Sequence, residues 1–468
     1  MRQPSRPLLN ATFAAAAGVL TAVAALSVVA GVAIARRADV VSDQPLGAMI
    51  DATHAPPLLT LPGDDVTLRY DVVCADPGND PDNGGSCNAG GTVFLRSGQS
   101  GPFRPIPLEV DSAAAEGRLY APVPPDVASS ADGFSYYAVL RNIATGATIT
   151  LPAGGANAPQ RSLPMVDPVT VDLGDHVFGA TDTPAARVAG AAWGGGLDEV
   201  GLEGGPEVQP VGATAFDVDG SGTVTVLDEV KKRVLRWASS RSSPQAVPLD
   251  ISGALADMSV GPEGAIYVLE SVREGGATPL LRSFDPAGRQ KATVHVAERT
   301  ASEVRVGEDG PVALSYPSGQ WMSVVRGGTA LAAHLQAESG TPFQVLPGGA
   351  GKVLVCRTGN EARVAVINAQ GARRSWRIRS STPIAEVQLA RPLGSRLVVV
   401  LRVYTDNRDE FVALVLGGKG VLAQLSLDSA DWAETAPLTR FRLVGKSLYQ
   451  LGSTPAGIFV DRYDLEVS

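Results

Sequence analysis

The chain has little histidine, few aromatic residues and fewer basic than acidic side chains. Its 468 residues include 5% aromatics and 48 acidic against 39 basic side chains, for a formal net charge of −9. Because phosphate backbones repel an acidic surface, this charge disfavours nucleic acid, and we predict no nucleic-acid partner. The histidines lie at no metal-ligand spacing, and the nucleophile motif G-x-S-x-G is absent, which disfavours zinc and serine-hydrolase chemistry. The four histidines are His54, His176, His295 and His334.

Long amphipathic helices are also not indicated, whereas turn residues are abundant. The chain contains 52 glycines and 34 prolines, which suits many short strands joined by turns. Its length allows two or three domains. We therefore predict an all-β protein with more than one domain.

A single long apolar run, residues 8–35, lies near the N-terminus between two pairs of arginines. A membrane-spanning helix needs about 20 apolar residues, whereas a signal-peptide core has about 7–15. We predict that residues 1–37 form an uncleaved signal-anchor in the cell membrane, with the N-terminus inside and the bulk of the protein extracytoplasmic. The alternative is a secreted protein cleaved after Ala35, because residues 33–35 fit the small-x-small rule.

Cysteine is scarce, with three residues in the chain. Cys74 and Cys87 flank a loop rich in Gly, Asp and Asn, and we predict a disulfide between them. The oxygen-rich part of this loop, residues 76–83, is interpreted as a solvated loop, with a calcium site as the alternative. Cys356 lies in an apolar run and is predicted to be a small buried hydrophobe.

Two segments precede the repetitive part of the chain. Residues 38–60 are polar and proline-containing, and we interpret them as a linker. Residues 61–164 alternate apolar and polar positions between turn signals, which predicts a β-sandwich. The succession of SYYAVLRN, a Thr-Gly turn and ITLPAGG resembles the immunoglobulin-like and fibronectin-III-like modules of bacterial surface proteins.

Residues 165–468 are predicted to form a propeller. Residues 165–188 link it to the sandwich and provide its first or closing strand, and the residues beyond them repeat one pattern of an apolar strand, an Asp/Gly turn, a second strand and a basic third strand. The sharpest copy is GATAFDVDGSGTVTVLDEVKKRVLRW, residues 212–237. This string resembles an NHL-type repeat, and a period of roughly 40–45 residues is typical of propellers. The resemblance implies a six-bladed propeller that is closed by an N-terminal strand pairing into the last blade. Trp237, which ends a patterned strand, is predicted to lie in the blade core.

One stretch of the first repeat has the spacing of a calcium-binding loop. Its oxygen-bearing side chains are Asp217, Asp219, Ser221, Thr223 and Asp228. Calcium prefers several hard oxygens converging from one loop. However, position 12 carries Asp in place of the usual Glu, and no helix-forming segment precedes Asp217. We therefore favour a structural inter-strand turn and keep calcium, the single candidate cofactor, as the alternative.

No constellation of catalytic residues is evident, so we predict a protein that is not an enzyme. The expected function is a binding or scaffold module that contacts an unidentified protein, peptide or glycan through propeller and sandwich surfaces. The alternative is a propeller lyase or hydrolase with a metal in its channel. An enzyme should bring carboxylates and amides to the central channel, whereas a scaffold should expose an apolar or aromatic patch on a face or rim.

Overall fold

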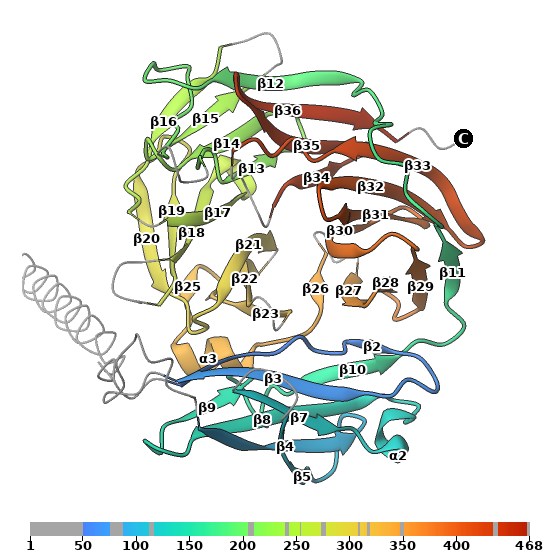
Figure 1. The fold of residues 1–468 in the computed structure, drawn as a ribbon. Helices are drawn as coiled ribbons and strands as arrows, with labels where there is room; N and C mark the ends of the chain where they lie inside the picture. Colours follow the sequence, from blue (N-terminus) through green and yellow to red (C-terminus); the bar gives the residue numbers. More distant parts are fainter. Residues whose placement is uncertain are drawn as a thin grey trace, which may run out of the picture. The chain divides into compact units, whose positions relative to one another are not determined.

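The computed structural model describes residues 50–74, 88–111, 117–204, 210–238, 243–252, 254–272, 278–307, 309–315, 319–346, 351–433 and 439–465. These residues are organised almost entirely as β-sheets (Figure 1). The predicted membrane segment, residues 1–37, lies outside them. Within the described ranges, no helix combines the length and apolarity needed to cross a membrane.

The first two sheets form a β-sandwich. One sheet has the order β1-β3-β7-β6, and the other has the order β2-β10-β8-β4-β5 with β9 added beside β8. Tyr70 and Tyr136, which are fully buried, lie between the sheets with Leu68 and Leu95. The elements are β1 (Ile50–Thr53), β2 (Leu59–Thr60), β3 (Thr67–Cys74), β4 (Ala89–Ser97), β5 (Arg104–Pro107), β6 (Glu109–Val110), β7 (Arg118–Pro122), α2 (Pro125–Ala128), β8 (Phe134–Asn142), β9 (Thr148–Leu151) and β10 (Gln160–Pro164).

The sandwich starts earlier than the sequence predicts. Residues 38–60 were expected to be a linker, but β1 and β2 fall inside this range and belong to the two sheets. Strand β1 alternates buried and exposed side chains, as a half-buried strand should. This alternation extends over four residues before the proline pair 56–57, so it is too short to stand out from a polar, proline-containing background.

Six further sheets follow one another along the chain and are arranged around a centre (Figure 1). Consecutive strands pair antiparallel within each sheet. Among the described residues, the sheet formed by residues 301–323 has three strands, and each of the other five sheets has at least four. Up-and-down sheets repeated around a ring define a β-propeller.

The sheets, numbered first to sixth, contain the following strands. They are β13 (Ala215–Val218), β14 (Val224–Asp228), β15 (Arg233–Trp237) and β16 (Gln245–Pro248); β17 (Ala254–Val260), β18 (Ile266–Val272), β19 (Leu280–Phe284) and β20 (Gln290–His295); β21 (Ala301–Gly307), β22 (Gly310–Ser315) and β23 (Gln320–Ser323); β26 (Gln344–Val345), β27 (Gly351–Thr358), β28 (Glu361–Asn368) and β29 (Arg373–Arg379); β30 (Ile384–Leu393), β31 (Arg396–Thr405), β32 (Arg408–Gly417) and β33 (Gly420–Asp428); and β34 (Phe441–Val444), β35 (Ser447–Thr454) and β36 (Gly457–Asp464). Outside them lie η3 (Pro262–Gly264), β24 (Val325–Arg326), β25 (Thr329–Ala330) and α3 (Ala333–Glu338).

Apolar side chains fill the spaces between neighbouring sheets. Leu227 of the first sheet and Met258 of the second share one cluster, and Phe216 of the first sheet and Leu451 of the sixth share another. Each fully buried side chain of this size contributes about 1.5–3 kcal/mol relative to its exposed state. Trp237 is 3% exposed within the second of these clusters, which confirms its predicted place in the blade core.

The segment that connects the sandwich to the first sheet runs along the outer edges of three sheets. Strand β11 (Val169–Asp172) pairs parallel with β29 at the edge of the fourth sheet. The Asp182 amide then donates a hydrogen bond to the Ser426 carbonyl of β33, and the Asp182 carboxylate accepts one from the Ser426 amide. Strand β12 (Ala186–Ala192) pairs antiparallel with β36 and completes the sixth sheet. The predicted ring closure by an N-terminal strand is therefore confirmed, and it leaves these edges covered.

The sandwich packs directly on the propeller. The face of the fourth sheet that points away from the fifth contributes Leu354 and Ala365 to a cluster with Leu59 and Met165 of the sandwich. Beside it, Arg363 of β28 donates a hydrogen bond to the Leu59 carbonyl at 2.9 Å and forms an ion pair with Asp64. Sandwich and propeller therefore share a hydrophobic core.

Candidate functional site

Of the five residues of the predicted calcium loop, Asp219, Ser221 and Thr223 come together in the β13–β14 turn, whereas Asp217 and Asp228 lie elsewhere. Asp217 accepts hydrogen bonds from Arg442 Nε at 3.0 Å and from the Val260 amide at 2.8 Å, so it bonds to the neighbouring sheets. Asp219 caps the β13–β14 turn by accepting from the backbone of Ser221 and Thr223. Its pKa is lowered: burial acts to raise it, but the combined hydrogen bonds from Ser221 and Thr223 outweigh that effect.

The last ligand candidate, Asp228, is fully buried at the far end of β14. It accepts from Arg233 Nε at 2.9 Å and from the Gly201 amide at 3.1 Å. Since Asp217 pairs with Thr225 across the hairpin, Asp217 and Asp228 are separated by three strand positions, or about 10 Å. The residues with calcium-like spacing therefore lie along two paired strands and the turn between them, and their five side chains do not surround one point.

Charged side chains from the first strands of several sheets meet at the centre of the ring. We call Asp217, Asp257, Glu303, Arg305, Arg391 and Arg442 the axial network. Arg305 of the third sheet pairs with Asp257 at 2.8 Å and reaches Thr439, just before the sixth sheet, at 2.9 Å. Arg305 also pairs with Glu303. Each of the three carboxylates in the network therefore faces a guanidinium.

Burial shifts the titration of this network. It raises the pKa of Glu303 to about 7, although the positive charge of Arg305 acts in the opposite direction. Burial, together with the nearby positive charges of Arg305 and Arg442, lowers the pKa of Arg391 to about 9. Across the described part of the chain, no group of three His, Cys, Asp or Glu side chains is placed to hold a metal ion.

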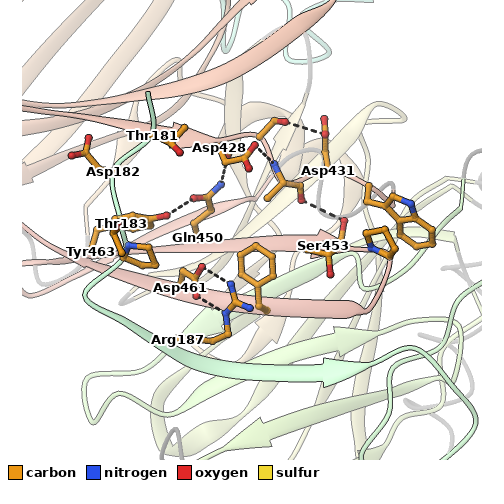
Figure 2. Close-up of a pocket in the computed structure, with 17 residues that line it drawn as sticks. Thr181, Asp182, Thr183, Arg187, Asp428, Asp431, Gln450, Ser453, Asp461 and Tyr463 are labelled. Atoms are coloured by element: carbon orange, nitrogen blue, oxygen red, sulfur yellow. Dashed lines mark hydrogen bonds and ion pairs between the residues drawn. The ribbon is translucent and has the colours of Figure 1, made fainter. Parts of the chain in front are cut away.

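A cavity of about 610 Å³ lies off the axis, where β12 closes the ring (Figure 2). We call it the closing cleft, and its walls are formed by residues 181–187, 428–432, 450–455 and 459–463. Buried Gln450, Phe459 and Asp461 form part of its lining, whereas Asp182 and Trp432 are exposed. The cleft combines segments that are about 250 residues apart in the sequence, and ring closure brings them together.

The β33–β34 loop forms one wall of the cleft. Ala430 has a left-handed backbone conformation with φ of 47°. Its carbonyl accepts a hydrogen bond from the Ser453 amide at 2.6 Å, and Ser453 Oγ accepts one from the Ala433 amide at 2.9 Å. Gly452 permits this close approach, because a Cβ there would lie 2.8 Å from the Ala430 Cβ. The loop that carries Asp428, Asp431 and Trp432 is therefore fixed to β35.

Arg187 of β12 forms the opposite wall. Its guanidinium donates two hydrogen bonds to Asp461, at 2.9 and 3.0 Å, and lies 3.9 Å from the centre of the Phe459 ring. Hydrogen bonding to Asp461 raises the pKa of Arg187. Burial, together with the negative charges of Asp461 and Asp428, raises the pKa of Tyr463 to about 12. The cleft is therefore lined by more acidic than basic side chains, namely four aspartates and Arg187.

The structure describes only part of the predicted cysteine features. Cys87 and residues 76–83 lie outside the described residues, so the predicted Cys74–Cys87 disulfide and the alternative calcium site in that loop stay predictions. Cys356 is half-buried, and its thiol points to the Leu59 carbonyl at 3.9 Å.

Sequence reasoning missed both the axial network and the closing cleft. The string Asp-Ser-Ala-Asp-Trp at 428–432 has the exposed turn composition that could have been noticed. Nothing in the sequence places this string beside Arg187, because that contact depends on which sheet β12 joins.

No protein-family model and no curated protein matches this sequence. Solved structures give distant likenesses. Virginiamycin B lyase from Staphylococcus aureus is 9% identical over 54% of this chain and 95% of its own, with a TM-score of 0.33. YCF48 bound to D1 peptide is 11% identical over 61% and 94%, with a TM-score of 0.31. A luciferin-regenerating enzyme is 8% identical over 55% and 92%, with a TM-score of 0.34. At these values the likenesses carry no argument about function, and the propeller assignment rests on the sheet order.

Proposed function

We propose that this protein is an extracytoplasmic, non-enzymatic binding or scaffold protein that contacts a protein, peptide or glycan through the closing cleft. In this proposal an NHL-type propeller and an immunoglobulin-like or fibronectin-III-like sandwich are held at a bacterial membrane by residues 8–35, or are secreted after cleavage at Ala35.

The observation that carries the proposal is the closing cleft itself. A concave site with a few convergent polar groups beside aromatic rings is the usual form of a binding site. Its loop is held by Ser453 and packs against Gly452, so little conformational entropy is lost on binding. Trp432 packs against Trp193, with 6.0 Å between the ring centroids, and is still 38% exposed at the rim, where exposed tryptophan is typical of binding sites.

A second candidate function is a propeller enzyme, a lyase or hydrolase, acting on the axis. The observation in its favour is Glu303, whose burial raises its pKa to about 7, in the range useful for proton transfer. Against it, the axial carboxylates of Asp217 and Asp257 are paired with arginines. A channel metal has no ligand cluster among the described residues.

The test is selection from a random peptide display library and a glycan array on the immobilised full-length chain. We expect a sequence or glycan class that is retained by the wild type and lost with Trp432→Ala. The matched control is Tyr404→Ala, which removes an aromatic side chain that is 42% exposed outside the cleft. Equal retention by the wild type and by Trp432→Ala would reject the closing cleft as the binding site.

A further inference from the structure

The closing cleft contains more negative charge than its own residues neutralise. Four aspartates line it, Asp182, Asp428, Asp431 and Asp461, together with a single basic residue, Arg187. Arg187 is paired with Asp461. The other three carboxylates have no ion-pair partner within the described ranges, and accept hydrogen bonds at 2.8–3.3 Å from uncharged donors: the Ser426 amide, the Ala430 amide and the Ser429 hydroxyl.

The nearest buried cation does not remove this excess. Arg440 is buried behind the loop, donates to the Ser429 carbonyl at 2.7 Å and interacts electrostatically with Asp431. When Arg187 and Arg440 are both counted against the four aspartates, two negative charges still have no cation to balance them. Asp428 is exposed and Asp431 is half-exposed. In a cavity with low-dielectric walls, the uncompensated charges reinforce one another and attract a cation.

The side chain of Arg187 already shows how a cationic group of a ligand would bind in this cleft. The Arg187 guanidinium is bound by both oxygens of Asp461 and stacks on Phe459. Carboxylates and an aromatic ring together are the usual receptor for a guanidinium or an ammonium group. Trp432, beside Asp428 and Asp431, offers the same combination on the opposite wall.

Resting on the proposed function, we infer that the ligand of the closing cleft is a basic segment of a protein partner, which inserts an arginine or lysine side chain between Trp432 and the carboxylates of Asp428 and Asp431. The aliphatic stem of that side chain packs on the ring, and its charged group pairs with the carboxylates. A cavity of about 610 Å³ accommodates a few residues of such a segment.

The experiment measures binding of fluorescent peptides to the full-length chain by anisotropy. The probe is a short arginine-containing peptide, and its partner carries citrulline, which has nearly the same shape without the charge. We expect the citrulline peptide to bind at least about tenfold more weakly, and the arginine peptide to lose affinity as salt increases.

The protein variant is the double substitution Asp428→Asn with Asp431→Asn, and the control is Asp406→Asn, an exposed aspartate outside the cleft. The double variant should lose about tenfold or more in affinity for the arginine peptide, and the control should not change. If the double variant fails to fold, the two peptides on the wild-type chain still decide the question.

The possible failures are distinguishable. Binding of neutral peptides or of oligosaccharides that depends on Trp432 but not on charge would overturn the basic ligand and leave the proposed binding function intact. Absence of any ligand whose binding depends on Trp432 would overturn both.

Discussion

His54 should make the stability of the sandwich depend on pH, and the burial of its ring sets the size of the effect. The ring is 7% exposed and stacks on Tyr70 at 4.3 Å, with its nitrogens bonded to the Arg69 carbonyl and the Tyr136 hydroxyl. Burial lowers its pKa from 6.5 to about 4, although the hydrogen bond to Arg69 acts to raise it. The folded protein therefore holds a neutral imidazole, and the unfolded chain binds a proton first as the pH falls.

Acid should therefore lower the free energy of unfolding through His54. The contribution of His54 to stability is complete above pH 6.5, and it is lost as the pH falls from 6.5 towards 4. Between pH 7 and pH 4.5 a shift of this size removes about 2 kcal/mol of unfolding free energy. Urea unfolding at the two pH values measures this loss in the wild type and in His54→Gln.

Because every other titrating group is common to both proteins, the difference between their two pH-dependent losses isolates His54. We expect the wild type to lose about 2 kcal/mol more than His54→Gln. The ring pKa, measured by NMR titration of labelled histidine, should lie well below 6. Equal losses together with a ring that titrates near 6.5 would refute the buried position of His54.

Three further predictions concern other parts of the molecule. Gly452→Ala places a Cβ 2.6 Å from the Phe459 ring, so calorimetry should show a loss of stability of about 1–3 kcal/mol, and a stability equal to wild type would show that the loop can move away. Arg442→Gln leaves the largely buried Asp217 carboxylate without its cation, and unfolding should show a loss of about 3–5 kcal/mol; Arg442→Lys should recover part of it. Burial raises the pKa of the Cys356 thiol to about 11, so its alkylation at pH 8 should be about a hundredfold slower than that of an exposed cysteine. Mass spectrometry measures this rate, and a rate near that of a free thiol would contradict the packing of Cys356.

The arrangement of the strands was largely predictable from the sequence because each propeller sheet is local. Each hairpin carries its own signal, an Asp/Gly turn between two apolar runs, as at Asp219 between β13 and β14. Ring closure by β12 could also be predicted, since a ring of sheets needs an N-terminal partner for its last sheet. The pairing of β11 with the fourth sheet was not predictable, because an edge strand pairs through its backbone and leaves little trace in its side chains.

The candidate sites were mostly not predictable, because they are made by contacts that are remote in sequence. The spacing of Asp217 and Asp228 indicated one loop, whereas strand pairing sends Asp217 to the axis and Asp228 into a buried pair with Arg233. The closing cleft joins Arg187 to Asp461, which are on strands brought together only by closure. Charge and aromatic content at 428–432 are visible in the sequence, but their shared cavity is not.

Photo-crosslinking from the closing cleft in the native cell envelope tests most directly whether the cleft binds a basic segment of a partner. A photoreactive phenylalanine derivative replaces Trp432 in the full-length chain, and the crosslinked partner peptide is identified by mass spectrometry. We predict one main adduct, formed outside the cytoplasm, with an arginine or lysine at or next to the crosslinked residue. This adduct should disappear when Asp428 and Asp431 are both changed to Asn. An adduct that persists in that double variant, or crosslinks to cytoplasmic proteins alone, would contradict binding of a basic partner segment in the closing cleft.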